Sequence, residues 1–277
     1  MPSTTIKTAL LALLCLVLHE APAQRYAPFE AVWQIRETGI DKIDVDRRGN
    51  IFFTTTSGNL KQYSASGDSI NYYALPFSSG ISRLDAHWTV SIFLFYESQQ
   101  RFEILDRFLS PLSSQEMADL GLSGFVGHAA PGNNHGIWLY DETDLSLKKI
   151  NYTDKRLIQE QILNRLIPES SLQITHMVER KNTLFIQVAA EGVYIFDNQA
   201  NFIKHLALDT DYPVFVENDN IFFLQENKLH RKNFLTGGSL HVELPDKYQY
   251  SGLALTGETV VMVHEQGLLA FPRPENF

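Results

Sequence analysis

The stretch that decides the fold is Ile43-Asp44-Val45-Asp46-Arg47-Arg48-Gly49-Asn50-Ile51-Phe52-Phe53-Thr54-Thr55. It contains two runs of strand-forming residues, Ile43–Val45 and Ile51–Thr55, on either side of a polar turn. In the turn, Asp46 begins the change of direction, Gly49 accepts a positive φ angle, and Asn50 hydrogen-bonds the backbone before the second run. The stretch therefore predicts a β-hairpin with a buried second strand.

The same arrangement recurs six times, beginning near Ile40, with a period of roughly 40 residues. Each unit has a short apolar strand, a turn, a strongly apolar strand, a polar or glycine turn, a third strand and a weaker fourth. The strongly apolar strands are Ile51–Thr55, Ser91–Tyr96, Gly136–Tyr140, Thr183–Val188, Asn220–Leu224 and Thr259–Val263. Four strands repeated at this period predict the blades of a β-propeller.

The last unit has only three strands, whereas a spare strand, Ala31–Arg36, precedes the first unit. A propeller closes its ring when a strand from one end of the chain completes a blade begun at the other, which protects open sheet edges. We therefore predict an all-β, six-bladed β-propeller with four-stranded blades, closed by the N-terminal strand. A β-sandwich would not give six similar units, a solenoid would need capping units at both ends, and seven blades would need a longer chain.

Two stretches are longer than a connection between blades requires, namely Ser113–Gly124 and Asp154–Ser171. Within the second, Lys155–Leu166 contains good helix formers at a partly helical spacing, which predicts a short helix on one face. Long loops of propellers often contact partners, although a tolerated insertion without a function is the simpler interpretation.

The first residues are typical of an export signal. Lys7 provides a positive start, Ala9–Leu18 is an apolar run, and Ala21-Pro22-Ala23 has the small-residue pattern of a cleavage site. The apolar run has about ten residues, whereas a bilayer span needs about 20. We predict a signal peptide over residues 1–23, cleavage between Ala23 and Gln24, and a single propeller domain over residues 24–277 with no transmembrane segment.

Cys15 is the only cysteine. Two alternatives to a cleaved signal are a buried N-terminal helix and a lipoprotein signal ending at Cys15, which Leu14 fits poorly. After cleavage the mature chain has no cysteine, and therefore no disulfide, thiolate nucleophile or cysteine-bound metal. An exported protein without disulfides fits a bacterial envelope, so we expect it in the periplasm or associated with the outer membrane.

The composition is that of a globular protein. Of the 277 residues, 44% are hydrophobic and 20% are charged, which excludes disordered, collagenous and coiled-coil classes. The formal net charge is −9, and no run of Lys and Arg stands out. Because nucleic-acid binders carry a basic patch and anionic lipids attract basic segments, neither nucleic acid nor an anionic membrane is an expected partner.

The stretch Asp46–Phe53 resembles the Asp-x-x-Gly-Asn-Ile-aromatic signature of six-bladed propellers in the broad NHL-repeat, gluconolactonase-like and YVTN-like group. The repeat pattern covers nearly all of the mature chain, but only the first unit carries the full signature. Unit two has His87-Trp88-Thr89-Val90 in its place, and unit five has Glu217-Asn218-Asp219-Asn220. The chain is also similar to exported propeller proteins of Bacteroidetes-type bacteria. The resemblance implies the fold, which hosts many functions.

The first strand of each blade is expected to line the central channel. These strands offer Asp44, Asp85, His128, His176, Glu217 and Ala254. The gluconolactonase-like resemblance implies a divalent metal held in the channel by Glu, Asn and Asp side chains, for which Asp44, Asp85 and Glu217 are the candidate oxygen ligands. Short carboxylates at strand starts more often form turns or solvate a channel, so we predict neither a bound metal nor another cofactor.

Other chemical motifs are weak. His128 and His135 flank Pro131-Gly132-Asn133-Asn134, and the Pro-Gly pair excludes a metal-binding histidine pair on a helix. His176 lies among apolar residues and is expected to be a satisfied core or channel histidine. No Gly-x-Ser-x-Gly elbow, Walker loop or Gly-x-Gly-x-x-Gly run is present. Asp68-Ser69-Ile70 resembles the O-glycosylation acceptor of Bacteroidetes-type exported proteins, although a plain turn also explains it.

A complete repeat pattern without a catalytic set predicts an exported, non-catalytic binding or scaffolding propeller of the bacterial envelope. Its expected partner is another envelope protein. Two alternatives stay open. One is a channel-metal hydrolase of lactonase type that uses Asp44, Asp85 and Glu217. The other is a carbohydrate- or peptide-binding module, suggested by 18 Phe, 11 Tyr and 3 Trp, although core packing also explains these aromatics.

Overall fold

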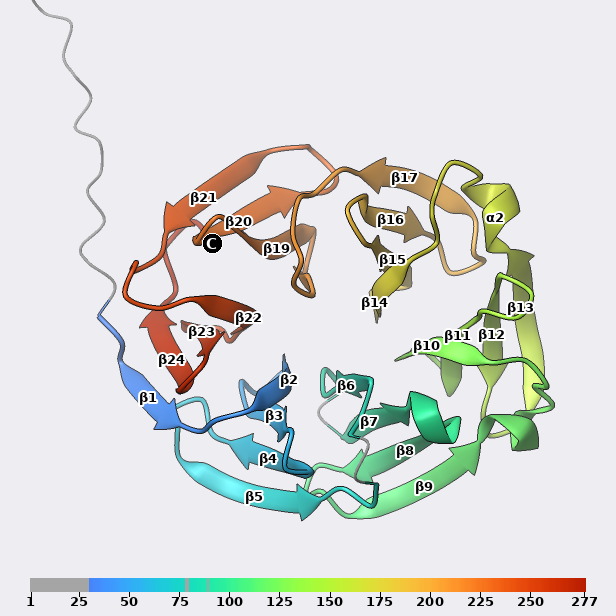
Figure 1. The fold of residues 1–277 in the computed structure, drawn as a ribbon, viewed down its shortest axis with the longest axis horizontal. Coiled ribbons are helices and arrows are strands. Elements are labelled where there is room, and N and C mark those ends of the chain that lie inside the picture. Colours follow the sequence, from blue (N-terminus) through green and yellow to red (C-terminus); the bar gives the residue numbers. More distant parts are fainter. Residues whose placement is uncertain (1–29, 78–79, 89) are drawn as a thin grey trace, which may run out of the picture.

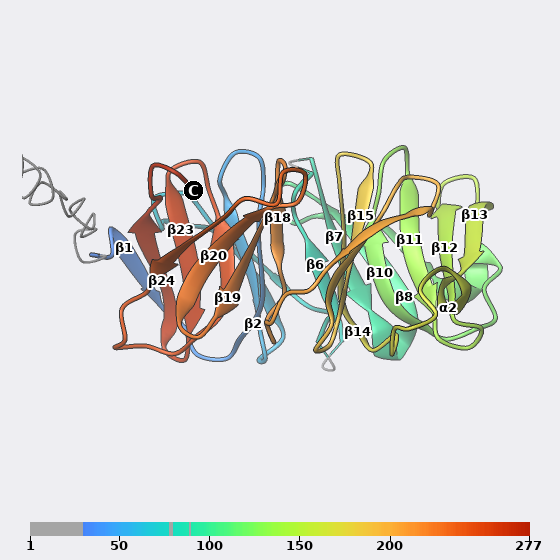
Figure 2. The ribbon, with the colours of Figure 1, turned by 90° about the horizontal axis from the view of Figure 1, so that it is seen from above.

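The computed structural model describes residues 30–77, 80–88 and 90–277. Six antiparallel sheets of four strands stand around a central channel (Figure 1). Seen from the side, the ring is a flat disc with its inner strands running across the thickness (Figure 2). The chain is a six-bladed, all-β propeller, so the predicted fold class is confirmed. The predicted signal peptide, with Cys15, Ala23 and Gln24, lies outside the described residues.

Each blade is one sheet whose strands follow one another from the channel outward. The blades are formed as follows: blade one by β2 (Ile40–Val45), β3 (Ile51–Thr55), β4 (Asn59–Tyr63) and β5 (Ser69–Ala74); blade two by β6 (Arg83–Asp85), β7 (Ser91–Tyr96), β8 (Arg101–Asp106) and β9 (Pro111–Glu116); blade three by β10 (Val126–Pro131), β11 (Gly136–Asp141), β12 (Ser146–Asn151) and β13 (Arg156–Ile162); blade four by β14 (Ile174–Arg180), β15 (Thr183–Val188), β16 (Gly192–Phe196) and β17 (Phe202–Leu206); blade five by β18 (Phe215–Glu217), β19 (Asn220–Gln225), β20 (Lys228–Asn233) and β21 (Ser239–Glu243); and blade six by β22 (Tyr250–Leu255), β23 (Thr259–His264), β24 (Gly267–Pro272) and β1 (Trp33–Arg36). Three single helical turns, η1 (Glu97–Gln99), η2 (Met117–Leu120) and α2 (Leu163–Leu166), lie between strands.

The ring is closed by β1, as predicted. This strand pairs antiparallel with β24, with Trp33 opposite Ala270 and Arg36 opposite Gly267. In Figure 1 the two strands lie side by side at the outer edge of blade six. Every other strand pair in the described chain joins neighbours in sequence, so β1–β24 is the pair that turns a row of blades into a ring.

The core consists of six apolar clusters, one between each pair of adjacent blades. The second strand of a blade supplies both of its neighbours. In β3, for example, Phe52 packs toward blade two while Phe53 packs toward blade six. Since successive strand residues point to opposite faces, a strand buried on both faces is a continuous apolar run. This is why these strands stand out in the sequence.

In the turn between β2 and β3, Asp46 and Gly49 have the expected geometry, whereas the Asn50 side chain bonds the Asp46 carboxylate instead of the backbone. Asp46 Oδ1 accepts hydrogen bonds from the backbone N–H groups of Arg48 and Asn50, both at 2.8 Å, and Asp46 Oδ2 accepts one from the Asn50 side chain at 2.9 Å. Gly49 has a φ angle of +83°. The turn is thereby held by a single carboxylate.

The helix predicted over Lys155–Leu166 is wrong for most of its length. Arg156–Ile162 is β13, the outer strand of blade three, and only Leu163–Leu166 forms a helical turn. Ladder bonds to β12 satisfy this backbone, and that tertiary pairing overrides the helix propensity of the side chains. Ser113–Gly124 is likewise no free loop, because it begins in the outer strand β9 and continues into η2, where Met117 and Leu120 are buried.

Candidate functional site in the central channel

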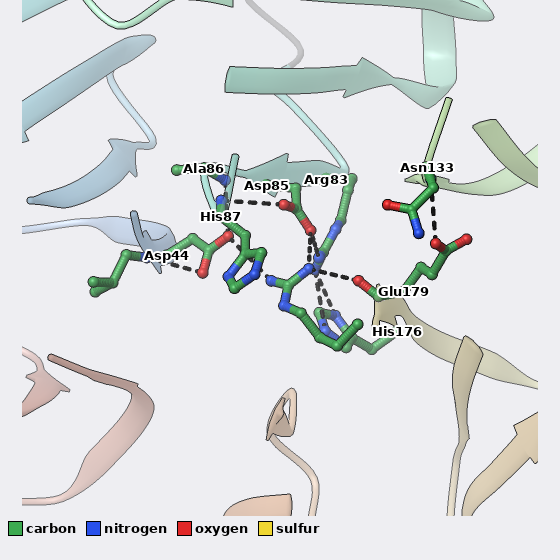
Figure 3. Close-up of polar contacts among 10 residues, drawn as sticks. Asp44, Arg83, Asp85, Ala86, His87, Asn133, His176 and Glu179 are labelled. Carbon is green, nitrogen blue, oxygen red and sulfur yellow. Dashed lines mark hydrogen bonds and ion pairs between the residues drawn. The ribbon is translucent and has the colours of Figure 1, made fainter. Parts of the chain in front are cut away.

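Three of the predicted channel residues, Asp44, His128 and His176, line the cavity of the central channel, and Asp85 is completely buried beside it. All four lie on the inner strands of blades one to four. Two arginines that the sequence analysis did not single out, Arg83 and Arg180, complete the group. Figure 3 shows Asp44, Arg83, Asp85 and His176 gathered at one side of the channel. Together these side chains form what we call the channel cluster.

Arg180, at the end of β14 in blade four, reaches the carboxylates of two other blades. Its Nη1 lies 3.0 Å from Oδ2 of Asp85 at the end of β6, and its Nη2 lies 3.7 Å from Oδ2 of Asp44 in β2. All three side chains are buried. A buried charge is tolerated only when it is paired, so the arginine and the two carboxylates hold blades one, two and four together.

Asp85 is held in its charged form. Its Oδ2 accepts a hydrogen bond from Arg83 Nη2 at 2.6 Å as well as the one from Arg180, and its Oδ1 accepts one from the backbone of His87 at 3.3 Å. Complete burial disfavours the charge, but the pKa of Asp85 is nevertheless lowered because Arg180 and Arg83 stabilise the carboxylate. Asp85 is therefore an anchor for the two arginines.

The pKa of Asp44 is shifted in the opposite direction from that of Asp85. Its two oxygens accept hydrogen bonds from the backbone of Val45 and of Ala86 in the neighbouring blade, both at 2.8 Å. Burial, followed by the nearby charge of Asp85, raises the pKa of Asp44 to about 6. Asp44 thus takes up a proton under mildly acidic conditions while Asp85 stays charged.

The imidazole of His176 packs against the guanidinium of Arg83. Arg83 Nη1 lies 3.2 Å from Nδ1 and 3.1 Å from Nε2 of His176. A point this close to both ring nitrogens cannot lie in the ring plane without overlapping ring carbons, so Nη1 lies over the ring face. Burial and the charge of Arg83 hold the pKa of His176 well below its usual value, and burial lowers the pKa of His128 to about 4. Both imidazoles are neutral near pH 7.

A second buried network lies beside the channel cluster. The carboxylate of Glu179 accepts hydrogen bonds from the indole of Trp138 at 2.5 Å and from the backbone of Asn133 at 3.2 Å, and it pairs with Lys149. The backbone carbonyl of Glu179 accepts a hydrogen bond from Arg180 Nη1 at 2.9 Å. Figure 3 includes the contacts of Glu179 with Asn133 and with the cluster. The network joins blades three and four and positions Arg180.

A cavity of about 310 Å³ occupies the channel on the side where the inner strands begin. Lys42 and Asp41 lie at its rim as an ion pair of 2.7 Å. Asp44 and Arg180, from the far ends of their strands, form its floor. The cavity is therefore bordered by the channel cluster on one side and at its floor.

The remaining candidates are placed elsewhere. Glu217 forms an ion pair with Arg273 rather than with Asp44 or Asp85, and Ala254 is packed in the core between blades six and one. His135 lies on the β10–β11 turn, where its Nδ1 is 3.1 Å from the Tyr152 hydroxyl. Over residues 30–77, 80–88 and 90–277, no three His, Cys, Asp or Glu side chains are grouped as a metal would require. Asp68-Ser69-Ile70 opens β5 at an exposed turn.

The fold defines the class of protein as a six-bladed β-propeller. Similar solved structures include PorZ, described as an essential bacterial surface component of the type-IX secretion system of Porphyromonas gingivalis. It has 15% identity and a TM-score of 0.55, with coverage of 88% of this chain and 33% of PorZ. This chain therefore spans about one third of the length of PorZ.

Two further structures show the same likeness. An inactive variant of virginiamycin B lyase from Staphylococcus aureus, solved with quinupristin, has 12% identity, coverage of 85% and 80% of the two chains, and a TM-score of 0.56. An extracellular domain assigned to a one-component system of B. thetaiotaomicron has 13% identity, coverage of 84% and 33%, and a TM-score of 0.54. No protein-family model and no curated sequence matches the chain. These likenesses concern the fold.

Proposed function

We propose that this protein is an exported, non-catalytic binding propeller of the bacterial envelope that docks on another envelope protein. The observation that carries the proposal is that the acidic groups of the channel cluster are already bonded to other groups of the chain. Asp44 and Asp85 are the acidic groups best placed for chemistry, yet both are bonded by arginines and backbone N–H groups of the chain itself. Their role is to hold blades together, which leaves the rigid ring to present its surfaces.

The outer edge of blades one and two supports a protein partner. Ile70 and Tyr72 of β5, Phe108 in the β8–β9 turn and Leu112 of β9 are large apolar side chains with at least half of their surface exposed, and Tyr72 reaches 70%. The Asn71 side chain donates a hydrogen bond to the Phe108 carbonyl at 2.5 Å, which holds the two blades together at this edge. Exposed large apolar side chains on the outer strands of neighbouring blades are candidate contacts for a partner.

Two further points support the envelope assignment. The sequence predicts a signal peptide over residues 1–23, and one protein of similar fold, PorZ, is by its description a bacterial surface component. Within the described residues, no helix has both the length and the apolar character needed to cross a bilayer.

The test is affinity purification from gently solubilised native envelopes, with the tag placed after Phe277, followed by mass spectrometry. A stoichiometric envelope protein is expected, and the double variant Tyr72→Ser, Phe108→Ser is expected to lose it. Leu235→Ser, an equally exposed apolar residue in blade five, is the matched control and should retain the partner. A monomer that brings down nothing from crosslinked envelopes would contradict the proposal.

The competing function is a channel-metal hydrolase of lactonase type. Asp44 and Asp85 do lie together, but Arg180 occupies the position between them and Glu217 pairs with Arg273. Calorimetric titration with calcium and zinc tests this alternative directly. Tight binding that is lost in Asp85→Asn would favour the hydrolase over the docking protein.

A further inference from the structure

The walls of the channel cavity differ from one side of the ring to the other. Blades five and six contribute apolar side chains, among them Phe215, Leu253 and Val263. Blades two to four contribute Arg83, His128 and His176 together with hydroxyl groups. A purely apolar ligand would strip water from the polar wall without replacing its hydrogen bonds, which is costly. A uniformly polar ligand would gain nothing from the apolar wall.

The charge that the polar wall presents to the cavity is positive. Asp85 is completely buried behind Arg83, whose own side chain is 11% exposed. His128 and His176 are neutral, so they add hydrogen-bonding groups without charge. Both oxygens of Asp44, at the floor, are already bonded to backbone N–H groups. The guanidinium of Arg83, with that of Arg180 at the floor, is therefore the cationic group that a ligand in the cavity meets.

Arg83 also has hydrogen-bonding capacity left over. A guanidinium carries five N–H donors. Nη2 bonds Asp85, and Nη1 lies over the neutral ring of His176. Nε has no hydrogen-bond partner among the described residues but is fully buried, so the N–H groups left for a ligand are those of Nη1 and Nη2 that Asp85 does not use. An unsatisfied buried donor costs about 1–3 kcal/mol, and a carboxylate is the group whose geometry matches a guanidinium.

We infer that the channel cavity binds a small carboxylate ligand with a short apolar body. Arg83 pairs with the carboxylate, His128 and His176 supply further hydrogen bonds, and Phe215 and Leu253 pack against the body. A volume of about 310 Å³ lies at the small end of ligand pockets, so the ligand has few atoms inside the channel. The same chemistry is offered by a free carboxylic acid and by the C-terminal residue of a peptide.

A charged residue at the rim of the cavity distinguishes an anionic ligand from a cationic one. Glu97 lies at the edge of the cavity in blade two and carries a charge of the same sign as the ligand. Replacing it with a neutral residue of the same shape removes repulsion without touching the buried cluster. A carboxylate ligand should therefore bind more tightly to Glu97→Gln, whereas a cationic ligand should bind less tightly.

The experiment is isothermal titration calorimetry on the purified protein with isocaproate and, as its uncharged match, isocaproamide. Isocaproate is expected to bind with a dissociation constant on the order of 1 mM or below, and the amide about tenfold more weakly because it lacks the charge-assisted bonds. Acetyl-glycyl-leucine and its C-terminal amide form the second pair. Tighter binding of the peptide acid than of isocaproate identifies a chain terminus as the ligand, and the reverse identifies a free acid.

Variants then assign the residues. Arg83→Gln should weaken isocaproate binding about tenfold, whereas Arg101→Gln, an arginine of the outer surface paired with Glu116, should not. If Arg83→Gln fails to fold, Arg83→Lys, which keeps a charge beside Asp85, and Phe215→Ala take its place, each with an expected loss of several-fold. Equal binding of acid and amide, or no heat from either at about 10 mM, would overturn the inference. Retention of an envelope partner by Arg83→Gln would separate this result from the proposed docking function.

Discussion

Asp46 accepts three hydrogen bonds in its turn, and the same pattern of bonds recurs in turns that lack the sequence signature. Asp106 and Asp197 each accept two backbone hydrogen bonds at 2.8 or 2.9 Å in the turns before β9 and β17. The residue at a positive φ angle in those turns is Leu109 or Ala200 rather than glycine. One carboxylate acceptor thus defines this turn more consistently than glycine does, which is why the sequence signature reveals only one of the three.

Substitution of Asp46 tests this account. Asp46→Ala removes all three side-chain hydrogen bonds and leaves the N–H groups of Arg48 and Asn50 without this acceptor, so the free energy of unfolding should fall by about 2 kcal/mol. Asp46→Asn keeps one acceptor oxygen and should cost less than about 1 kcal/mol. Urea denaturation of the three proteins measures both. Equal losses in the two variants would show that the charge, rather than the turn, is what matters.

The histidines of the channel predict how stability depends on pH. Burial lowers the pKa of His87 and of His128 to about 4, and holds that of His176 well below 6.5. The folded state therefore binds fewer protons than the unfolded state between about pH 4 and 6.5, and stability is lost as pH falls through this range. The raised pKa of Asp44 acts in the opposite direction, because protonation relieves the cost of its buried charge between about pH 6 and 4. Because three histidines oppose the single carboxyl of Asp44, the net effect is a loss of stability as the pH falls.

The free energy of unfolding is accordingly expected to fall by about 2 kcal/mol or more between pH 7 and pH 5. Chemical denaturation at a series of pH values measures this slope. His128→Gln, which keeps a donor for the backbone of Ile174, should make the slope shallower. A slope that is unchanged in this variant would mean that His128 is solvated and does not titrate with folding.

At the scale of the element, the pairing of β1 with β24 depends on a close backbone approach. Gly267 begins β24 with a φ angle of +142°, and a Cβ atom there would lie 1.9 Å from the Ile35 carbonyl oxygen and 2.9 Å from the Glu37 nitrogen. No side chain can be accommodated at that distance without separating the strands. Glycine at this position is therefore a requirement of ring closure.

Gly267→Ala should destabilise the fold by at least about 3 kcal/mol and increase amide exchange in β1. Gly58→Ala is the matched control, because Gly58 has a φ angle of +82° but no atom within 4 Å of the added Cβ. The control should lose only the cost of a left-handed alanine, about 1–2 kcal/mol. Thermal or urea denaturation together with hydrogen exchange checks both. Equal losses would show that backbone conformation, and not the strand contact, explains the effect.

How far the elements could be predicted depends on their burial. The second strands of the blades are buried on both faces, as Ile51–Thr55 is along its whole length, and such runs are unmistakable in the sequence. Outer strands have no such signal. In β13 most side chains are exposed, including Leu157 and Ile158, so neither the strand alternation nor the burial that would separate it from a helix is present. Only its pairing with β12 decides its conformation.

At the scale of the whole molecule, Arg180 is a tie between blades that are not neighbours. Arg180→Met leaves Asp44 and Asp85 buried without the cation that they share, and the free energy of unfolding should fall by about 3–5 kcal/mol near pH 7. The loss should shrink toward pH 5, because Asp44 then becomes neutral. Urea denaturation at the two pH values measures this, with exposed Lys181→Met as the control. A loss that does not change with pH would assign the effect to packing instead of charge.

The candidate site could be predicted only in part, and the reason is physical. The position of the inner strands in the repeat was enough to predict that Asp44, Asp85, His128 and His176 lie at the channel. The curvature of the ring determines which of these side chains touch. Arg180 bonds Asp85 although 95 residues separate them in the sequence, and no local pattern encodes such a contact. One signal was available, since Arg83 lies two residues before Asp85 on the same strand face, and a buried carboxylate needs a cation nearby.

The β1–β24 pairing also determines how the ring is made. Every other strand pair joins segments adjacent in sequence and can form as soon as both have left the ribosome, but β24 stays an open edge until the earliest strand of the described chain returns to it. We expect the closure of so long a loop to be the slow step of assembly. Until it occurs, the edge of β24 is also open to the β1 of a second molecule, which competes with the chain's own strand when the protein is concentrated. High concentration during refolding should therefore produce exchanged dimers, each with two complete rings, that do not revert once closed.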